Sequence, residues 1–170
     1  MHHRLFKAMV HILFVYVDTM NYINTSTGDR NMKDGLFKYS FLMLIGGFSY
    51  YYIEIVFRGY SHISMIICGG ICFVLSGMIN QVLGQEISLV SQMVISAIMI
   101  TAVEFLTGVI VNIIMDLNVW DYSDVPYNVL GQICLPYSLI WFFLSLICIF
   151  LDDLIRYKVF DEEKVRYKIL

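Results

Sequence analysis

The sequence has little charge and little proline, and both shortages bear on the class of protein. Charged residues make up 15% of the 170 positions, whereas a soluble domain carries about 25%. Hydrophobic residues account for 59%, and the mean hydropathy is +0.72. Only two prolines are present to interrupt apolar stretches. This composition argues against an ordinary soluble domain and favours an integral membrane protein.

Several functional motifs are also missing. The net charge is -3 and no basic patch contains interleaved aromatic residues, so we expect no nucleic-acid partner. The sequence has no Walker A motif, no catalytic triad pattern and no cluster with metal-ligand spacing. We therefore predict no cofactor, no metal site and no enzymatic activity. The apolar stretch 5–20 contains Lys7, His11 and Asp18 and lacks a small-residue cleavage site, which argues against a secretory signal.

The four cysteines all lie inside apolar stretches, and none forms a CxxC pair. We interpret them as small apolar side chains, because unpaired cysteine is readily buried. They are Cys68, Cys72, Cys134 and Cys148.

Four apolar stretches are long enough to cross a hydrocarbon core, which requires ~20 helical residues. They run from about 36 to 57, 63 to 83, 89 to 115 and 129 to 151. The intervening linkers are short, so neighbouring spans must be antiparallel. The sequence therefore predicts an all-α membrane protein, a compact bundle of four transmembrane helices, with residues 36–151 as the membrane domain.

The two ends of the chain lie outside this predicted domain. Residues 5–23 have a short apolar core that carries charge, which fits either an amphipathic helix at the membrane surface or a fifth span. Residues 24–35 are polar and read as a loop, so 1–35 form one N-terminal segment. Residues 152–170 are expected to form a charged cytoplasmic tail.

The basic residues predict the orientation of the bundle. Of 11 Lys and Arg residues, Arg58 alone lies in a linker, and the others precede the first span, lie at its starting edge (Lys38) or follow the last span. Cytoplasmic segments are enriched in Lys and Arg. We therefore expect a multi-pass protein of the cell membrane with both termini cytoplasmic and the linker 116–128 outside.

Glu104 lies near the centre of the third span. An ionised carboxylate at that depth costs roughly 2.5–3.5 kcal/mol even on lenient scales, so Glu104 should face other helices, be protonated or be paired. Thr101, Gly108 and Asn112 share its helical face, and such a stripe belongs against neighbouring helices. Two roles stay open: an interhelical hydrogen bond that fixes packing, or a proton or substrate site.

Glu54 and Arg58 lie four residues apart near the outer end of the first span. That spacing places them on one helix face, where they can form an ion pair. We favour a structural pair, although Arg58 could instead pair with Glu104 or Asp121.

Small residues and proline mark two other spans. The second span contains Gly69, Gly70 and Gly77, which let helices approach closely and predict that this span is the most central. In the fourth span, Pro136 removes the hydrogen bond to Gln132 and is expected to kink the helix. A broken helix can expose backbone groups to a ligand at membrane depth.

The outer linker has the densest set of turn-forming and interfacial residues. Tryptophan and tyrosine anchor at the headgroup level, and Asp, Ser and Pro favour turns. Asn128 is expected to cap the fourth span. We predict an ordered segment, here called the lid, which comprises residues 120–128 and contains Trp120, Asp121, Tyr122, Ser123, Pro126 and Asn128.

The lid and the spans beside it resemble a bacterial family of integral membrane proteins described as putative ABC-transporter type IV. The family pattern WDYS–P–N–G–C–W is matched by Trp120, Asp121, Tyr122, Ser123, Pro126, Asn128, Gly131, Cys134 and Trp141. The family also has an acidic residue followed by a pair of small residues, which is matched by Glu104, Thr107 and Gly108. An earlier E…R element of the family is matched by Glu54 and Arg58. The resemblance covers about residues 41–150.

The resemblance implies a permease component, and because the chain has no nucleotide-binding motif, any ATPase would be a separate subunit. Four spans are few for a permease, which predicts a homo-oligomer or a partner membrane subunit in the lipid bilayer. On this hypothesis Glu104, Asn112 and Gln132 line a polar cavity under the lid and transport an unknown small solute.

Two further hypotheses compete with transport. A non-transport module for assembly, sensing or partner binding is favoured by the lack of a coupling device and by the basic tail. An intramembrane enzyme would use Glu54, Arg58, His62 and Asp121, but no nucleophile motif accompanies them.

Overall fold

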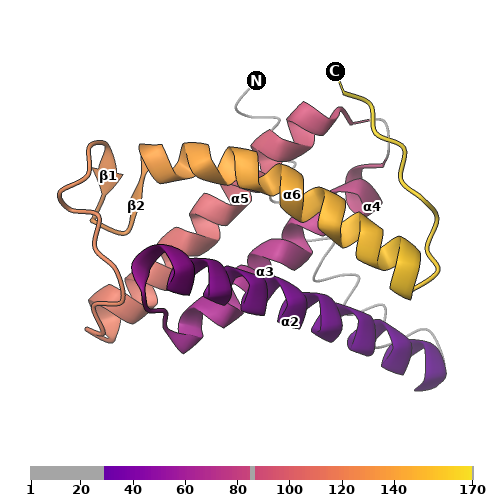
Figure 1. Ribbon diagram of the computed structural model, residues 1–170, viewed down its shortest axis with the longest axis horizontal. Helices are drawn as coiled ribbons and strands as arrows, with labels where there is room; N and C mark the ends of the chain where they lie inside the picture. The colour runs from indigo at the N-terminus through magenta and orange to yellow at the C-terminus, as the bar shows by residue number, and fades with distance from the viewer. Residues whose placement is uncertain (1–28, 85–86, 170) are drawn as a thin grey trace.

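The computed structural model of the protein describes residues 29–84 and 87–169, and Figure 1 shows their arrangement. The predicted amphipathic or fifth helix at 5–23 lies outside the described residues. The helices and strands are α2 (Asp29–Arg58), α3 (Ile63–Gly77), α4 (Ile79–Leu83), α5 (Leu89–Gly108), the π-helix η1 (Val109–Ile114), β1 (Asn128–Val129), β2 (Ile133–Cys134) and α6 (Leu135–Val159).

Within the described ranges, four helical stretches of 21 to 26 residues are apolar and long enough to cross a membrane. Crossing needs ~20 residues. α3 continues into α4, and α5 continues into η1, so each of these pairs forms one stretch. These stretches confirm the predicted all-α membrane fold, and they are Gly35–Arg58, Ile63–Leu83, Leu89–Ile114 and Leu135–Val159.

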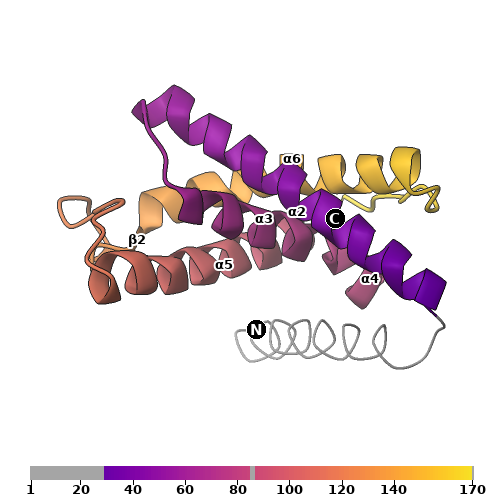
Figure 2. The same ribbon diagram turned by 90° about the horizontal axis from the view of Figure 1, so that it is seen from below.

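The stretch formed by α3 and α4 is the most central, as its small residues predicted. In its most apolar window 67% of residues are buried, against 22% for the stretch in α2. A Cβ atom on Gly70 would lie 2.5 Å from the carbonyl oxygen of Met43 in α2, and one on Gly47 would overlap the carbonyl oxygen of Ile66. Glycine at these positions allows the backbones of α2 and α3 to touch where they cross obliquely (Figure 2).

The start of the fourth span differs from the prediction. Residues 128–134 form a short antiparallel hairpin in which Asn128 pairs with Cys134, and α6 begins only at Leu135. Asn128 therefore does not cap α6; Cys134 is the N-cap residue and makes no capping bond through its side chain. Pro136 lies in the first turn of α6, where its missing N–H has no partner to lose. The predicted kink at Pro136 is wrong for this reason.

The other end of α6 also differs from the prediction. The helix continues to Val159, beyond the expected end at 151, because Asp152, Asp153 and Arg156 are buried against neighbouring helices. The following residues run back across this end of the bundle (Figure 1). Leu89 N–H at the start of α5 donates to the carbonyl oxygen of Lys168, at 2.6 Å. Part of the predicted tail is thus packed on the bundle.

Candidate functional site

The stripe on the third span faces the interior, as its small and polar residues predicted. Thr101 Oγ1 donates to Ser138 Oγ of α6 at 3.2 Å. A Cβ atom on Gly108 would lie 2.6 Å from Gln132 Oε1 and 3.0 Å from the indole of Trp120. Glycine at position 108 therefore lets the segment after η1 pack directly on α5.

Asn112 and Gln132 are brought together, and they fasten the lid to the bundle. Asn112 Nδ2 donates to Gln132 Oε1 at 2.8 Å, and Asn112 Oδ1 accepts from Val119 N–H at 2.7 Å. Trp120 Nε1 donates to the carbonyl oxygen of Gln132 at 2.9 Å. Asn112 lies in the π-helix η1, and such distortions of a helix recur at functional sites. These bonds explain the burial of Trp120.

The lid itself is held by turns, which confirms that it is ordered. Asp121 Oδ1 accepts from the Ser123 backbone N–H at 2.8 Å and from its hydroxyl at 2.6 Å. These two bonds hold the pKa of the Asp121 carboxyl below its ordinary value. Asn128 Nδ2 donates to the carbonyl oxygens of Ser123 and Val125, at 3.1 and 2.9 Å. Asn128 thus closes the lid, which is the role the structure gives it in place of capping α6.

Gly131, in the turn between β1 and β2, is required by its backbone. It has φ +68, which favours glycine, and a Cβ atom there would lie 2.6 Å from Asp121 Oδ1. Its N–H donates to Asn128 Oδ1 at 3.1 Å, and its carbonyl oxygen accepts from Tyr122 N–H at 2.7 Å.

Glu54 and Arg58 form the predicted ion pair, with 2.7 Å between Glu54 Oε1 and Arg58 Nη1. Ser61 Oγ donates to the other carboxylate oxygen at 2.5 Å. Arg58 Nη2 also donates to the carbonyl oxygen of Val119 at 2.7 Å. Arg58 therefore joins α2 to Val119, the residue just before the lid, instead of pairing with Glu104 or Asp121.

The four residues considered for an enzyme do not converge. Glu54 and Arg58 are paired with each other, and Asp121 is bound within the lid. His62 is the N-cap of α3, where its Nδ1 accepts from Ser64 N–H at 3.3 Å.

Glu104 is buried, with 3% of its surface exposed, and both of its carboxylate oxygens are engaged. Oε2 accepts from Trp141 Nε1 of α6 at 2.8 Å, and Oε1 accepts from the hydroxyl of Tyr122 in the lid at 3.3 Å. Burial raises the pKa of Tyr122, and the negative charge of Glu104 adds to this effect. Glu104 therefore links α5 to α6 and to the lid, which is the interhelical bond that its position suggested.

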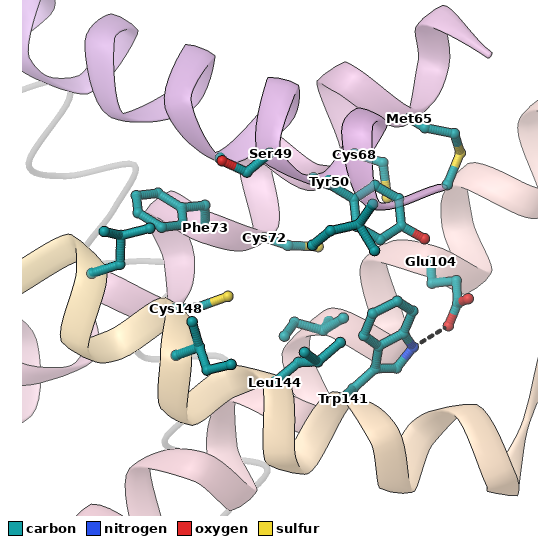
Figure 3. Close-up of a pocket in the computed structure, with 16 residues that line it drawn as sticks. Ser49, Tyr50, Met65, Cys68, Cys72, Phe73, Glu104, Trp141, Leu144 and Cys148 are labelled. Carbon is teal, nitrogen blue, oxygen red and sulfur yellow. Dashed lines mark hydrogen bonds between the residues drawn. The ribbon is translucent and has the colours of Figure 1, made fainter. Parts of the chain in front are cut away.

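Beside Glu104 lies a cavity of about 150 Å³ that is walled by α2, α3, α5 and α6. Figure 3 shows Trp141 with its ring toward the neighbouring apolar side chains and its N–H toward Glu104. The lining has almost no polar surface, and it includes Glu104 but neither Asn112 nor Gln132. Its members are Gly46, Ser49, Tyr50, Ile53, Met65, Cys68, Gly69, Cys72, Phe73, Ile100, Glu104, Trp141, Leu144, Ile147, Cys148 and Leu151.

Three of the four cysteines line this cavity, which their sequence positions did not suggest. Cys68 and Cys72 come from α3 and Cys148 from α6, whereas Cys134 is buried elsewhere, in β2. All four are free thiols. In the part of the chain that the structure describes, no group of His, Cys, Asp and Glu is placed to hold a metal ion. The three cavity thiols form part of a lining that has almost no polar surface.

A second buried polar cluster, at the opposite end of α6, was missed by the sequence reasoning. Arg156 Nε donates to Asp152 Oδ2, and Asp153 Oδ2 accepts from Asn80 Nδ2 at 2.8 Å and from the Tyr167 hydroxyl at 2.7 Å. The spacing of four between Asp152 and Arg156 was a signal for a helical ion pair. The signal is easy to miss because these charges follow an apolar run, as the first residues of a cytoplasmic tail would.

The comparisons with known proteins agree with this architecture. Neither a curated protein nor a solved structure matches the chain. The family model described as "putative ABC-transporter type IV" matches residues 20–166, a longer range than the sequence resemblance covered. The match includes the four membrane-spanning stretches, the lid and the second polar cluster except Tyr167. The chain is therefore a multi-pass membrane protein that belongs to the putative ABC-transporter type IV family.

Proposed function

We propose that this protein is a permease-like subunit of the cell membrane whose ligand site is the cavity between α2, α3, α5 and α6. The observation that carries the proposal is a buried carboxyl group, Glu104, at the wall of a cavity within the membrane-spanning helices. Acidic residues at membrane depth are expensive and usually mark a ligand or ion pathway. The family description supports the proposal because it names a transporter.

The apolar lining changes the kind of solute we expect. A polar molecule that enters such a cavity gives up its bonds with water and finds few replacements, at a cost of roughly 2–7 kcal/mol per unpaired group. Asn112 and Gln132 do not offer such replacements, since they bind each other. The proposed solute is therefore apolar over the part that the cavity holds.

Four membrane spans are few for a complete transport pathway, but they are enough to form one of its walls. The proposed working unit is thus an oligomer of this chain or a complex with another membrane subunit, with both termini in the cytoplasm. An ATPase would be a separate subunit, because the sequence has no Walker A motif.

Within this proposal Glu104 is a positioning residue that holds Trp141 and Tyr122. Its two hydrogen bonds join the cavity wall to the lid. Movement of the lid would therefore be transmitted to the indole ring that faces the cavity. Glutamine at this position keeps the shape but replaces one carboxylate oxygen by an NH2 group, so Glu104→Gln removes the charge and keeps the contact with Tyr122 only if that hydroxyl turns to accept.

The natural cysteines allow a test that needs no known solute. A permease must open its site to water on each side in turn. In a Cys134→Ser protein, we expect Cys68, Cys72 and Cys148 to react with a charged, membrane-impermeant thiol reagent in both right-side-out and inside-out vesicles. The control keeps Cys134 and replaces the three cavity cysteines by alanine, and it should stay unlabelled until it is denatured.

Glu104→Gln sharpens this test. We expect it to change the ratio of labelling between the two faces several-fold while the unfolding temperature in detergent stays within a few degrees. Labelling from neither face would overturn the permease proposal. A Glu104→Gln protein that labels like the parent but unfolds readily would show that Glu104 serves packing alone.

A non-transport module is the second candidate, and a specific observation favours it. The lid and Val119 just before it are bonded to η1, to Gln132 in the turn between β1 and β2, and to Arg58 of α2, which suits a static structure better than a gate. Vesicles in which the cavity thiols never react would support this candidate.

A further inference from the structure

We infer that the cavity holds the end of one acyl chain of a membrane phospholipid. The inference takes the position of the site from the proposed function, and it names the chemical class of the occupant. Transport of that lipid is not required for the inference to hold.

The size of the cavity sets the size of the occupant. Apolar cavities of about 150 Å³ in protein interiors stay dry and accept a ligand as large as benzene. The cavity here has that volume, about 150 Å³. It therefore accommodates a hydrocarbon group of roughly six carbon atoms, which corresponds to the end of an acyl chain.

The cavity opens to the surface that faces hydrocarbon. Ile53 of α2 is 38% exposed and Ile147 of α6 is 60% exposed, yet both line the cavity. Ser49 of α2, also exposed, lies on the same side. The mouth is thus between α2 and α6, along the membrane-spanning part of both helices. A chain from the surrounding bilayer reaches the cavity without crossing water.

The walls of the cavity are shaped by two close helix contacts. A Cβ atom on Gly69 would lie 2.6 Å from Tyr50 Cβ, and one on Gly46 would overlap Phe73. Because these glycines let α2 and α3 approach, the rings of Tyr50 and Phe73 stand on either side of the cavity, with Trp141 and Leu144 across from them (Figure 3). These rigid aromatic rings offer an acyl chain many contacts. Because they are rigid, they do not collapse into the cavity when it is empty.

The energetics favour hydrocarbon over other occupants. An empty apolar cavity forfeits the dispersion contacts of its lining, and a lipid chain restores them. A chain that moves from the bilayer into the cavity loses no hydration and therefore gains no hydrophobic energy. Binding rests on packing alone, so the site should be sensitive to its volume and tolerant of the lipid headgroup.

Trp141 provides a direct measurement, since the chain has only two tryptophans and the other, Trp120, belongs to the lid and not to the cavity lining. A Trp120→Phe protein is reconstituted in phosphatidylcholine with brominated acyl chains, and bromine quenches Trp141 fluorescence on contact. We compare Cys148→Phe, which fills the cavity, with Ile140→Phe, which adds bulk on the lipid-facing side of the same helix.

We expect strong quenching of Trp141 in the Trp120→Phe protein and in the Ile140→Phe control. Cys148→Phe should reduce the quenching at least two-fold. Equal quenching in the two variants would overturn the inference, because the quenching lipid would then lie outside the cavity. If Cys148→Phe does not fold, Leu144→Phe, which also narrows the cavity, decides in its place by the same comparison.

Native mass spectrometry of the protein released from mixed-lipid vesicles identifies the source of the chain. One bound phospholipid in the parent, lost in the filled variant, supports the inference, whereas a bound free fatty acid or no adduct contradicts it. The two proposals fail separately. If the lipid quenches Trp141 but the cavity thiols are not labelled from water, the lipid site is supported and the permease proposal is overturned. If the cavity thiols are labelled from both faces but Trp141 is not quenched, the permease proposal is supported and the acyl-chain inference is overturned.

Discussion

Among the residues that the structure describes, two buried polar clusters lie toward the two ends of α6, and they are stabilised in opposite ways. The lid cluster (Glu104, Asn112, Trp120, Gln132 and Trp141) is joined by hydrogen bonds to neutral donors and to the backbone. The tail cluster (Asn80, Asp152, Asp153, Arg156 and Tyr167) brings three charged groups together in the interior.

The difference is clearest in the atoms left without partners. No side-chain nitrogen or oxygen of the lid cluster is buried without a hydrogen bond. In the tail cluster, Asn80 Oδ1, Asp152 Oδ1 and both terminal nitrogens of Arg156 have none within the described residues, and neither has Ser76 Oγ nearby in sequence. Glu162 Oε1 stands 3.7 Å from Arg156 Nη1, too far for a good hydrogen bond.

This contrast shows how a membrane bundle can bury polar groups at unequal cost. A satisfied network rigidifies the structure around it, whereas a half-satisfied one is expensive. The lid cluster therefore gives the cavity a fixed wall. The tail cluster depends on the mutual neutralisation of Asp152 and Arg156, and the loss of either charge should cost more than any single loss at the lid.

The largest effect is therefore expected from Asp152→Ala. Arg156 is 2% exposed and would keep a buried charge without its partner, which costs about 3–5 kcal/mol. Urea unfolding of the detergent-solubilised protein measures the loss. The double variant Asp152→Leu with Arg156→Met removes both charges and should recover much of it. A loss below about 1 kcal/mol for Asp152→Ala, the range of exposed pairs, would show that water already screens this pair.

A smaller effect is expected at the lid from Asn112→Leu. This change leaves the buried Val119 N–H without its partner, which costs about 1–3 kcal/mol. Gln132 loses its bond with Asn112 but keeps the one to the Leu130 carbonyl oxygen. Trp120 should move, because its indole N–H is held by the Gln132 carbonyl oxygen. The measurements are unfolding in urea and the emission wavelength of Trp120 in a Trp141→Phe background. An unchanged wavelength would mean that the lid does not depend on this network.

A still smaller loss of stability is expected at the contact between the tail and the bundle. Burial raises the pKa of the Tyr167 hydroxyl, and its hydrogen bond to Asp153 adds to this. Tyr167→Phe should cost about 1 kcal/mol, the usual value of one hydrogen bond. Tyr157→Phe, at a more exposed position of the same region, is the matched control and should be neutral. Equal effects of the two changes would show that the tail contact contributes nothing specific.

The sequence predicted the spans well because hydrocarbon imposes a length and a composition that are visible locally. The partners of Glu104 could not be predicted in this way, since Trp141 lies 37 residues away along the chain. The start of α6 was predicted too early because the hairpin depends on the pairing of Asn128 with Cys134 and on the positive φ of Gly131. The lid was predicted as ordered because its turn residues and aromatic anchors act over short distances.

The tail cluster shows the opposite limit of sequence reasoning. Asp152, Asp153 and Arg156 follow an apolar run and look like the first charges outside the membrane. Their burial depends on Asn80, which is 73 residues away, and on Gly77, where a Cβ atom would overlap the Asp152 carboxylate. Only the packing of α3 and α4 against α6 reveals that these charges belong to the interior.

The smallest expected effect concerns pH and the lid alone. Because its bonds with Ser123 hold the pKa of Asp121 below its ordinary value, the folded lid favours the ionised carboxyl. The stabilisation is thus fully present above the unfolded pKa of ~3.9 and is lost as the pH falls through the lower folded value. Amide hydrogen exchange in residues 119–134, corrected for its intrinsic pH dependence, should lose protection below about pH 4. Asp121→Asn keeps an acceptor oxygen but cannot titrate, so its protection should not change across this range. If the protection of the parent lid is also unchanged by acid, the turn is held by Asn128 and Gly131, and the charge of Asp121 does not contribute.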